Sequence, residues 1–347
     1  MLNIVLEKGV GGDEIQTYLE TCPNTLIYTT PRFMRLVSTH LSAEAAWLVA
    51  RDEGSIAGVL PFLKKSGKYG AVFNSLAYYG SNGGVVQQHE HLEAKRRLVA
   101  RYYELAMEQG AASATLISNP LEKDGPFYHE VTAYDCLDER IGQFTHFDGK
   151  PSSTLMDSFQ DPRPRNIKKA IKEGIEISCS NDRLAMEFLY ETHVENMRAI
   201  GGLAKSREFF DLTLSSMPAS DWKIYTAKKD GIRVAALLVF YFNRTVEYFC
   251  PVVKEAFRST QALSLSIFRA MQDAIDAGCV HWNWGGTWLT QGGVYDFKKR
   301  WGTTDYQYYY YTRLFSPDVV NASKQELLQE YAGFFVLPFS ALRKEDA

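Results

Sequence analysis

The sequence predicts an α/β protein with mixed α+β sheets, built from two similar units in tandem. Three observations lead to this prediction. Two segments have the pattern of a β-hairpin, that is, a strand, a tight turn and a second strand. After each hairpin comes a predicted helix that ends at a glycine and leads into another apolar run. The chain of 347 residues is long enough for about two domains. Its 46% hydrophobic and 23% charged residues are typical of a globular protein and exclude a disordered one.

The two predicted hairpins share one residue pattern. The first, WLVARDEGSIAGVLPFL, begins at Trp47, and the second, WKIYTAKKDGIRVAALLVF, begins at Trp222. In each, two apolar runs flank a charged turn that closes on a glycine, Gly54 or Gly231, as tight hairpin turns commonly do.

The helix that follows each hairpin also has its counterpart in the other half. The first is expected over 92–109 and the second over 261–277, and Gly110 and Gly278 stand where a helix usually stops. The helix-ending glycines are separated by nearly the same number of residues as the two hairpin glycines. Chance could produce one matching hairpin, but it is a poorer explanation of a whole matching order of elements. The sequence therefore predicts a duplicated unit.

The remaining elements complete a prediction of three segments. The stretch 145–166, rich in Gly, Pro, Ser and Asp, is predicted to be a linker. After it we expect helices at 166–174 and 184–199 around a strand at 175–180, and after Ser323 a helix broken near Pro338. The predicted segments are a first unit over 1–150, a second unit over 151–315 and a helical tail over 316–347.

Charge and composition exclude several classes of function. The net charge of −3 and pI of about 6.2 exclude a strong overall attraction to nucleic acid but leave a local basic groove open, and no DNA partner is expected. The five scattered cysteines, with no CxxC pair, indicate a reducing compartment, and His89 and His91 lack a third ligand, so no metal site is expected. The first residues, MLNIVLEKGVGGDE, contain acidic residues and glycines where a signal peptide would have its apolar run. The longest apolar run, Val234 to Phe242, is about half as long as a membrane span. We expect a cytoplasmic protein and leave peripheral membrane association open.

Aromatic residues concentrate near the end of the second unit. Eleven of the chain's 46 aromatic residues lie within 282–311. Strand alternation places Trp282 and Trp284 on one face, and the following Gly285 and Gly286 permit close backbone approach or positive φ. Core packing explains any one of these aromatics, but the whole stretch favours a ligand groove.

A short turn or helix, YDFKKRWG, follows this strand. Phe297 and Trp301 share one helix face, and Lys298 places an ammonium group beside that face. A tyrosine-rich strand is then expected to close the unit.

A basic segment opens the second unit. Five cations occur within ten residues with no acid among them, namely Arg163, Arg165, Lys168, Lys169 and Lys172. Lys168 and Lys172 lie on one helix face. Two interpretations stay open: a site for a phosphate-rich ligand such as a nucleotide-linked precursor, CoA or tRNA, or a plain solvated helix face.

These segments together resemble a known family. The predicted elements of the second unit follow the order found in a GNAT acyltransferase domain: two helices, a hairpin, a further strand, a helix and a strand. WNWGGT…GGVYDFKKRWG resembles the terminal signature of the Fem-type (FemAB-like, BioF2-like) peptidyltransferases, a GNAT branch with two tandem GNAT-like domains. The stretches DPRPRNIKKAIKEGIEI and YYGSNGGVV also resemble that family. Its members transfer amino acids from aminoacyl-tRNA to the peptide of cell-wall precursors.

The resemblance implies roles for several residues. Lys298 matches the lysine of the family's FK element and is expected to neutralise negative charge near the transferring acyl group, because a tetrahedral intermediate develops an oxyanion. Asp296 is a candidate to steer or deprotonate the amine, or else a turn or cap residue, and Tyr295 either orients substrate or packs in the core. The other substrate-binding candidates are Trp284, Gly285, Gly286, Phe297, Trp301 and Tyr248.

The donor is the most open part of the prediction. GNAT enzymes that use acetyl-CoA hold its pyrophosphate on an R-x-x-G-x-G/A turn before a helix. Here Arg258 is present, but Gln261 and Leu263 replace both glycines, which argues against ordinary acetyl-CoA use.

The resulting prediction is a transferase without a bound cofactor. It moves an aminoacyl or acyl group from aminoacyl-tRNA or acyl-CoA onto an amine of a nucleotide- or lipid-linked cell-envelope precursor, such as a peptidoglycan peptide or an amino sugar. Two alternatives remain: a CoA-dependent N-acyltransferase on the same fold, and a non-catalytic module that binds glycan or peptide.

Overall fold

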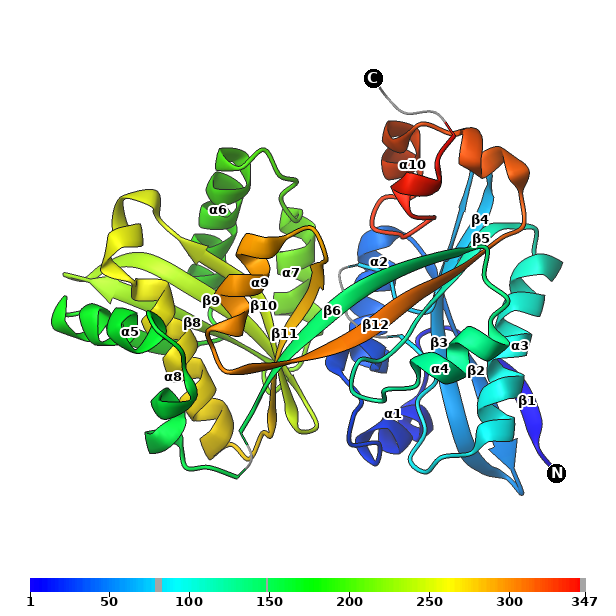
Figure 1. Cartoon of the computed structure of the whole chain (residues 1–347), viewed down its shortest axis with the longest axis horizontal. Helices are drawn as coiled ribbons and strands as arrows, with labels where there is room; N and C mark the ends of the chain where they lie inside the picture. The colour runs from blue at the N-terminus through cyan, green and yellow to red at the C-terminus, as the bar shows by residue number, and fades with distance from the viewer. Residues whose placement is uncertain (79–82, 148, 344–347) are drawn as a thin grey trace. The chain divides into compact units, whose positions relative to one another are not determined.

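The computed structural model describes residues 1–78, 83–147 and 149–343 (Figure 1). Residues 79–82 of the family-like stretch YYGSNGGVV lie outside the described residues. The structure is described below as two compact units, which the contacts within the chain define.

Unit 1 comprises residues 1–141 and 306–347, and unit 2 comprises residues 142–305. Unit 2 thus begins and ends somewhat earlier in the chain than the predicted second domain. The C-terminal tail, predicted as a separate segment, lies in unit 1, because Tyr331 accepts a hydrogen bond from the backbone of Tyr69 and donates one to the carbonyl of Gly70.

Unit 1 combines one sheet with helices and short 3-10 turns. Its strands are β1 (Asn3–Lys8), β2 (Glu44–Asp52), β3 (Ser55–Gly67), β4 (Gly70–Asn74) and β5 (Ala111–Ile117). Its α-helices are α1 (Asp13–Glu20), α2 (Pro31–Leu41), α3 (Leu92–Glu108), α4 (Gly125–Val131) and α10 (Lys324–Glu330). Its 3-10 helices are η1 (Ile27–Thr29), η4 (Pro317–Asn321) and η5 (Phe339–Ala341).

Unit 2 has the same kinds of element. Its strands are β7 (Glu176–Ser180), β8 (Trp222–Lys229), β9 (Ile232–Phe242), β10 (Thr245–Val253) and β11 (His281–Trp288). Its α-helices are α5 (Arg163–Lys172), α6 (Arg183–Ala199), α7 (Arg207–Ser216), α8 (Ala262–Asp276) and α9 (Gly292–Lys299). Its 3-10 helices are η2 (Ser152–Ser158) and η3 (Glu255–Thr260). Two long strands, β6 (Cys136–His146) and β12 (Thr303–Leu314), run from one unit's residues into the other's.

The predicted duplication appears in the order of elements. A strand, two helices, three strands, a helix, a strand, a helix and a strand occur in unit 1 from β1 to β6 and again from β7 to β12. In unit 1 the strand order is β1-β2-β3-β4-β5-β12, and in unit 2 it is β6-β11-β10-β9-β8-β7. In both copies the hairpin strands pair antiparallel, and the strands before and after the crossover helix pair in parallel.

Both hairpins close with the same kind of turn. Glu53 and Gly54 have φ values of 48° and 89°, and Asp230 and Gly231 have φ values of 50° and 78°. Positive φ at both central residues defines the type I′ turn, whose twist matches that of paired strands.

Each unit is a layered structure with helices on both faces of its sheet (Figure 1). In unit 1, Leu48 of β2 belongs to one apolar cluster with Leu98 and Tyr102 of α3. In unit 2, Leu237 of β9 belongs to a cluster with Met271 of α8. On the opposite face of unit 2, α6 contacts β9 and β10.

Three expectations about element positions need correction. The tyrosine-rich strand β12 does not close unit 2, because Tyr310 pairs with Ile117 of β5 in unit 1. Inside the predicted linker, η2 forms and helix α5 begins at Arg163 instead of residue 166. The helix of the tail ends at Glu330, well before Pro338.

Candidate active site

The parallel strands β10 and β11 of unit 2 stop pairing part of the way along their length. Among the described residues their register runs from Thr245 opposite His281 to Glu247 opposite Asn283 and extends no further, although both strands continue. Strand β10 is also irregular between Tyr248 and Cys250. Beyond this point the two strands no longer pair with each other, and the backbone of β11 takes side-chain partners instead, such as Lys298 at the Gly285 and Gly286 carbonyls.

The equivalent strands of unit 1 stay paired to their ends. Strand β4 pairs with β5 up to Asn74 opposite Thr115, and the next amide, that of Ser75, donates to the carbonyl of Thr115. The Ser75 hydroxyl then accepts from the amide of Ile117. The two units therefore differ at the position where a ligand could insert between parallel strands.

A buried polar pair marks the point where β10 and β11 separate. The Asn283 side chain donates to Glu247 Oε2 at 2.8 Å and accepts from the Gly285 amide at 2.8 Å. Asn283 is 0% and Glu247 is 1% exposed. Gly285 has a φ of 72°, a conformation that a residue with a Cβ adopts only at a cost. The pair thus fixes the backbone of the predicted Gly285–Gly286 element.

The Lys298 ammonium lies under this same backbone segment. Its Nζ donates to Gly285 O at 3.3 Å, Gly286 O at 3.1 Å and Thr287 Oγ1 at 2.8 Å, and Lys298 is 6% exposed. An ammonium group has three protons, so its three donors match these three acceptors. In this structure a substrate oxygen would have to displace one of them.

A second layer of hydrogen bonds supports the lysine's partners. Thr287 Oγ1 donates to Gln143 Oε1 at 3.3 Å, and Gln143 Nε2 lies 3.4 Å from both the Tyr295 carbonyl and Thr303 Oγ1. Thr287 and Gln143 are both buried. This network joins β11, α9 and the ends of β6 and β12 within unit 2.

Burial lowers the pKa of Lys298 from its ordinary value of 10.5 to about 8. Below pH 8 the group is charged in both the folded and the unfolded chain, and folding carries the full cost of burying it. Above pH 8 the folded protein releases this proton first. We expect the contribution of Lys298 to the unfolding free energy to rise by up to about 3 kcal/mol between pH 8 and 10.5. Urea unfolding of the wild type and Lys298→Met over this range isolates the contribution. If the difference in unfolding free energy between the two proteins did not change with pH, the lowered pKa of Lys298 would be contradicted.

The predicted aromatic side chains are brought together, chiefly as core. Trp284 and Trp301 have ring centroids 5.5 Å apart, and both belong to the apolar cluster of unit 2. Tyr248 lies 4.8 Å from Trp284, and Phe297 lies 6.4 Å from Trp301, as their shared helix face predicts. Trp284 and Trp301 are buried, so packing explains them, and contact with a ligand remains a proposal for the partly exposed Tyr248 and Phe297.

The basic segment is divided by the structure. Arg163 is buried, with its guanidinium 4.3 Å from the Phe297 ring centroid and Nη2 3.4 Å from the Phe297 carbonyl. Burial lowers the pKa of Arg163. The other four residues, Arg165, Lys168, Lys169 and Lys172, are exposed on α5. Only Arg163 is therefore part of the environment of α9.

The two polar candidates next to Lys298 point elsewhere. Asp296 is exposed, whereas Lys298, two residues later on the same helix, is buried, and residues at this spacing do not share a face. Tyr295 donates its hydroxyl proton to Asp305 at 2.7 Å, and this bond raises the pKa of Tyr295. The structure does not place either side chain against the Lys298 ammonium.

At the predicted pyrophosphate position, Gln261 has the left-handed backbone conformation that glycine usually adopts. Gln261 has φ 61° and ψ 26°, in the left-handed region, directly before α8. Its side chain donates to the Arg258 carbonyl at 3.2 Å and accepts from the Ser264 hydroxyl at 3.3 Å. Arg258 is exposed and pairs with Glu255 at 3.0 Å.

This conformation predicts the ranking of two substitutions at Gln261. Gln261→Ala and Gln261→Gly remove the same side-chain hydrogen bonds, but only glycine adopts positive φ without strain. We expect the Gly variant to exceed the Ala variant in unfolding free energy by about 1 kcal/mol. Chemical denaturation of both proteins measures the difference, and equal stabilities would show that the loop does not hold this conformation in solution.

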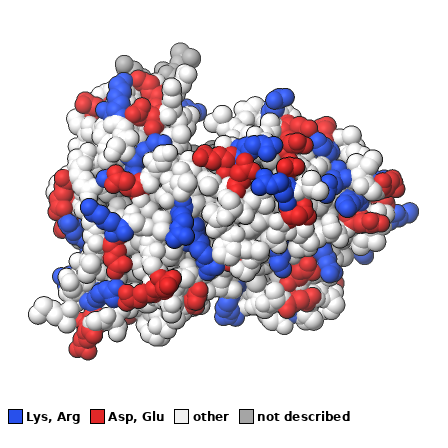
Figure 2. Space-filling model, turned by 180° about the vertical axis from the view of Figure 1, so that it is seen from behind, with Lys and Arg blue, Asp and Glu red and all other residues white. Residues whose placement is uncertain are grey.

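Two further classes of site find no support in the described parts of the chain. No group of three or more His, Cys, Asp or Glu side chains is arranged to hold a metal ion in the described ranges. No helix in these ranges is long and apolar enough to span a membrane. On the face shown in Figure 2, lysines and arginines are interspersed with acids and do not form one broad basic field.

The comparisons with known proteins agree with this architecture. Residues 163–299 match a family model described as an acetyltransferase (GNAT) domain. A comparison with curated protein sequences finds no match. Among solved structures, the chain is similar to FemX, with a TM-score of 0.72 and 14% identity over 93% of this chain and 99% of that one.

Two other solved structures share the fold. One is a tandem GNAT protein from the clavulanic acid biosynthesis pathway, with a TM-score of 0.52 and 14% identity over 91% of this chain and 99% of that one. The other is the C-terminal domain of a putative lysylphosphatidylglycerol synthetase from Agrobacterium fabrum, with a TM-score of 0.52 and 12% identity over 80% of this chain and 87% of that one. The chain therefore has a GNAT acyltransferase fold, which it shares over most of its length with FemX and with a tandem GNAT protein.

Sequence reasoning missed the residues that build the site around Lys298. Glu247, Asn283, Thr287 and Gln143 each occur as single polar residues in apolar or mixed strands. One signal was available: alternation in WNWGGT puts Asn283 on the face opposite the two tryptophans, where an amide must find a polar partner.

Proposed function

We propose that the protein is an acyltransferase of the Fem type that uses unit 2 for transfer. It moves an aminoacyl or acyl group onto an amine of a cell-envelope precursor, such as a peptidoglycan peptide or an amino sugar. The amine nitrogen attacks the carbonyl carbon of the donor ester or thioester, the bond to the donor oxygen or sulfur breaks, and the proton lost by the amine ends on that departing oxygen or sulfur, which leaves as an alcohol or a thiol.

One observation supports this proposal most strongly. Strands β10 and β11 part next to a buried cation, whereas the equivalent strands of unit 1 remain paired. In this proposal the donor carbonyl would enter where the strands part, and Lys298 would add a positive charge beneath the Gly285–Thr287 backbone. Catalysis would rest on positioning and on a preorganised field.

In this proposal Lys298 acts in one of two ways. It either contacts the developing oxyanion after giving up one of its three acceptors, or it acts as a positioning residue through the Gly285–Gly286 backbone. Arg163, stacked on Phe297 of α9, would support the same helix, and the exposed Arg165, Lys168 and Lys172 would contact phosphates of the donor or precursor.

For the donor, aminoacyl-tRNA is the leading choice because the Gln261 side chain occupies the turn where other GNAT enzymes place a glycine. A CoA-dependent N-acyltransferase is the second candidate. The observation that favours it is the left-handed backbone of Gln261, which keeps the shape of a pyrophosphate-binding turn.

A donor panel separates these possibilities. The purified protein is incubated with a nucleotide-linked muropeptide and either charged tRNAs or a series of acyl-CoA thioesters, and products are followed by mass spectrometry. Transfer from charged tRNA supports the leading proposal, and transfer from CoA alone overturns it in favour of the second candidate. Tight binding of the muropeptide with no turnover from any donor would indicate a binding module.

A further inference from the structure

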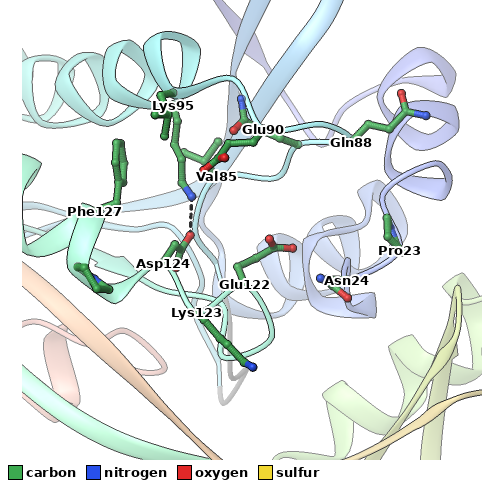
Figure 3. A pocket seen from close by; sticks show the side chains of 13 residues that line it. Pro23, Asn24, Val85, Gln88, Glu90, Lys95, Glu122, Lys123, Asp124 and Phe127 are labelled. Atoms are coloured by element: carbon green, nitrogen blue, oxygen red, sulfur yellow. Dashed lines mark ion pairs between the residues drawn. The ribbon is translucent and has the colours of Figure 1, made fainter. Parts of the chain in front are cut away.

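Unit 1 contains a cavity that the transfer site does not use. Its volume is about 410 Å³, within the range of small-ligand sites. It lies between the segment after α1, the start of α3, and the loop that joins β5 to α4 (Figure 3). All of its lining residues belong to unit 1.

The floor of the cavity is a buried ion pair. Lys95 Nζ lies 2.8 Å from Asp124 Oδ2, and the two side chains are 10% and 8% exposed (Figure 3). The same ammonium lies 5.0 Å from the Phe127 ring centroid and 5.3 Å from that of Tyr128. The cavity thus already holds one alkylammonium group between a carboxylate and aromatic faces.

Negative charge remains after this pair is formed. Glu122 and Glu90 also line the cavity, and in the described ranges no lysine or arginine forms an ion pair with either. Oδ1 of Asp124 is buried and makes no ion pair in the described ranges. The other lining cation, Lys123, has its ammonium 5.5 Å from the Tyr306 ring centroid.

The carboxylates are close enough to affect one another. Burial raises the pKa of Glu122, and the charges of Asp124 and Glu90 raise it further, against the opposing effects of Asn24 and Lys95. A bound cation would relieve this repulsion, whereas an anion would increase it.

From this geometry we propose that the cavity binds a primary ammonium group on an alkyl chain. The ammonium would lie between Glu122 and Glu90, above the buried pair of Lys95 and Asp124, and the alkyl chain would pack on apolar lining residues such as Leu92, Pro126 and Phe127. The inference does not depend on the proposed transfer reaction.

Ligand-observed NMR titration of the full chain tests this with three probes of one size. Pentylammonium is expected to bind, and 1-pentanol and pentanoate are expected to bind much more weakly. The variant Glu122→Gln removes one rim charge and should weaken pentylammonium binding about tenfold. Glu93→Gln removes an exposed charge from the first turn of α3 outside the cavity lining and should leave binding unchanged.

A double variant, Glu90→Gln with Glu122→Gln, avoids disturbing the buried pair and should weaken binding further. Binding of pentanoate equal to that of pentylammonium would overturn the proposal. So would pentylammonium binding that Glu122→Gln leaves unchanged, or no detectable binding of the amine to a wild-type protein whose circular dichroism shows it to be folded.

Discussion

The variant Lys298→Met is expected to turn over at least about 100-fold more slowly than the wild type. The substitution keeps the length and apolar character of the stem but removes the positive charge under Gly285, Gly286 and Thr287. Loss of one preorganised group at a developing oxyanion typically costs this much. The measurement is steady-state transfer with whichever donor supports activity.

The neighbouring lysine provides the matched control. Lys299 lies on the same helix but pairs with Asp305 at 3.1 Å near the surface, so Lys299→Met should keep kcat within about threefold of the wild type. A Lys298→Met protein that is folded and fully active would rule out both roles proposed for this lysine.

The pH profile distinguishes a charge requirement from a structural one. If the ammonium form is needed, kcat falls as pH rises through the pKa of Lys298, which burial lowers to about 8. Lys298→Arg carries a charge that persists at high pH, so any activity it retains should lack this alkaline decline. A residue with only a packing role would give the same profile in both proteins.

The variant Asn283→Leu is expected to lower the free energy of unfolding by about 3 kcal/mol. Leucine has a similar volume, but it leaves the buried carboxylate of Glu247 without the 2.8 Å bond from Asn283 and removes the acceptor of the Gly285 amide. Breaking a buried polar pair that includes a charge costs more than an ordinary hydrogen bond. Urea denaturation measures the loss.

The conservative change Glu247→Gln is the comparison for this effect. It keeps an acceptor for the Asn283 amide and removes only the charge, so the expected loss is smaller. If Asn283→Leu cost less than about 1 kcal/mol, the buried pair would not hold the strands at the point where they separate.

Much of the fold could be predicted because local chemistry determines it. The turn glycines Gly54 and Gly231 and the helix-ending glycines Gly110 and Gly278 all have positive φ, a preference that a sequence expresses directly. The pairing of Tyr310 with Ile117 could not be predicted in this way. A tyrosine-rich strand is compatible with either sheet, and strand partners far apart in sequence leave no local mark.

The candidate site was predicted only in outline. Spacing correctly placed Trp282 beside Trp284 and Phe297 beside Trp301, but it could not distinguish a groove wall from a core, since aromatic side chains serve both. Lys298 was identified by resemblance. Its three oxygen partners were not, because two of them are backbone carbonyls, which every residue possesses.

The central claim is that the donor binds where β10 and β11 separate in unit 2. Hydrogen–deuterium exchange with a non-reactive donor analogue, such as an amide-linked aminoacyl-tRNA, tests it most directly. We expect slower exchange in residues 245–253 and 281–288 when the analogue is bound, and no change in the paired strands 70–74 and 111–117. Protection confined to the strands of unit 1 would contradict the claim.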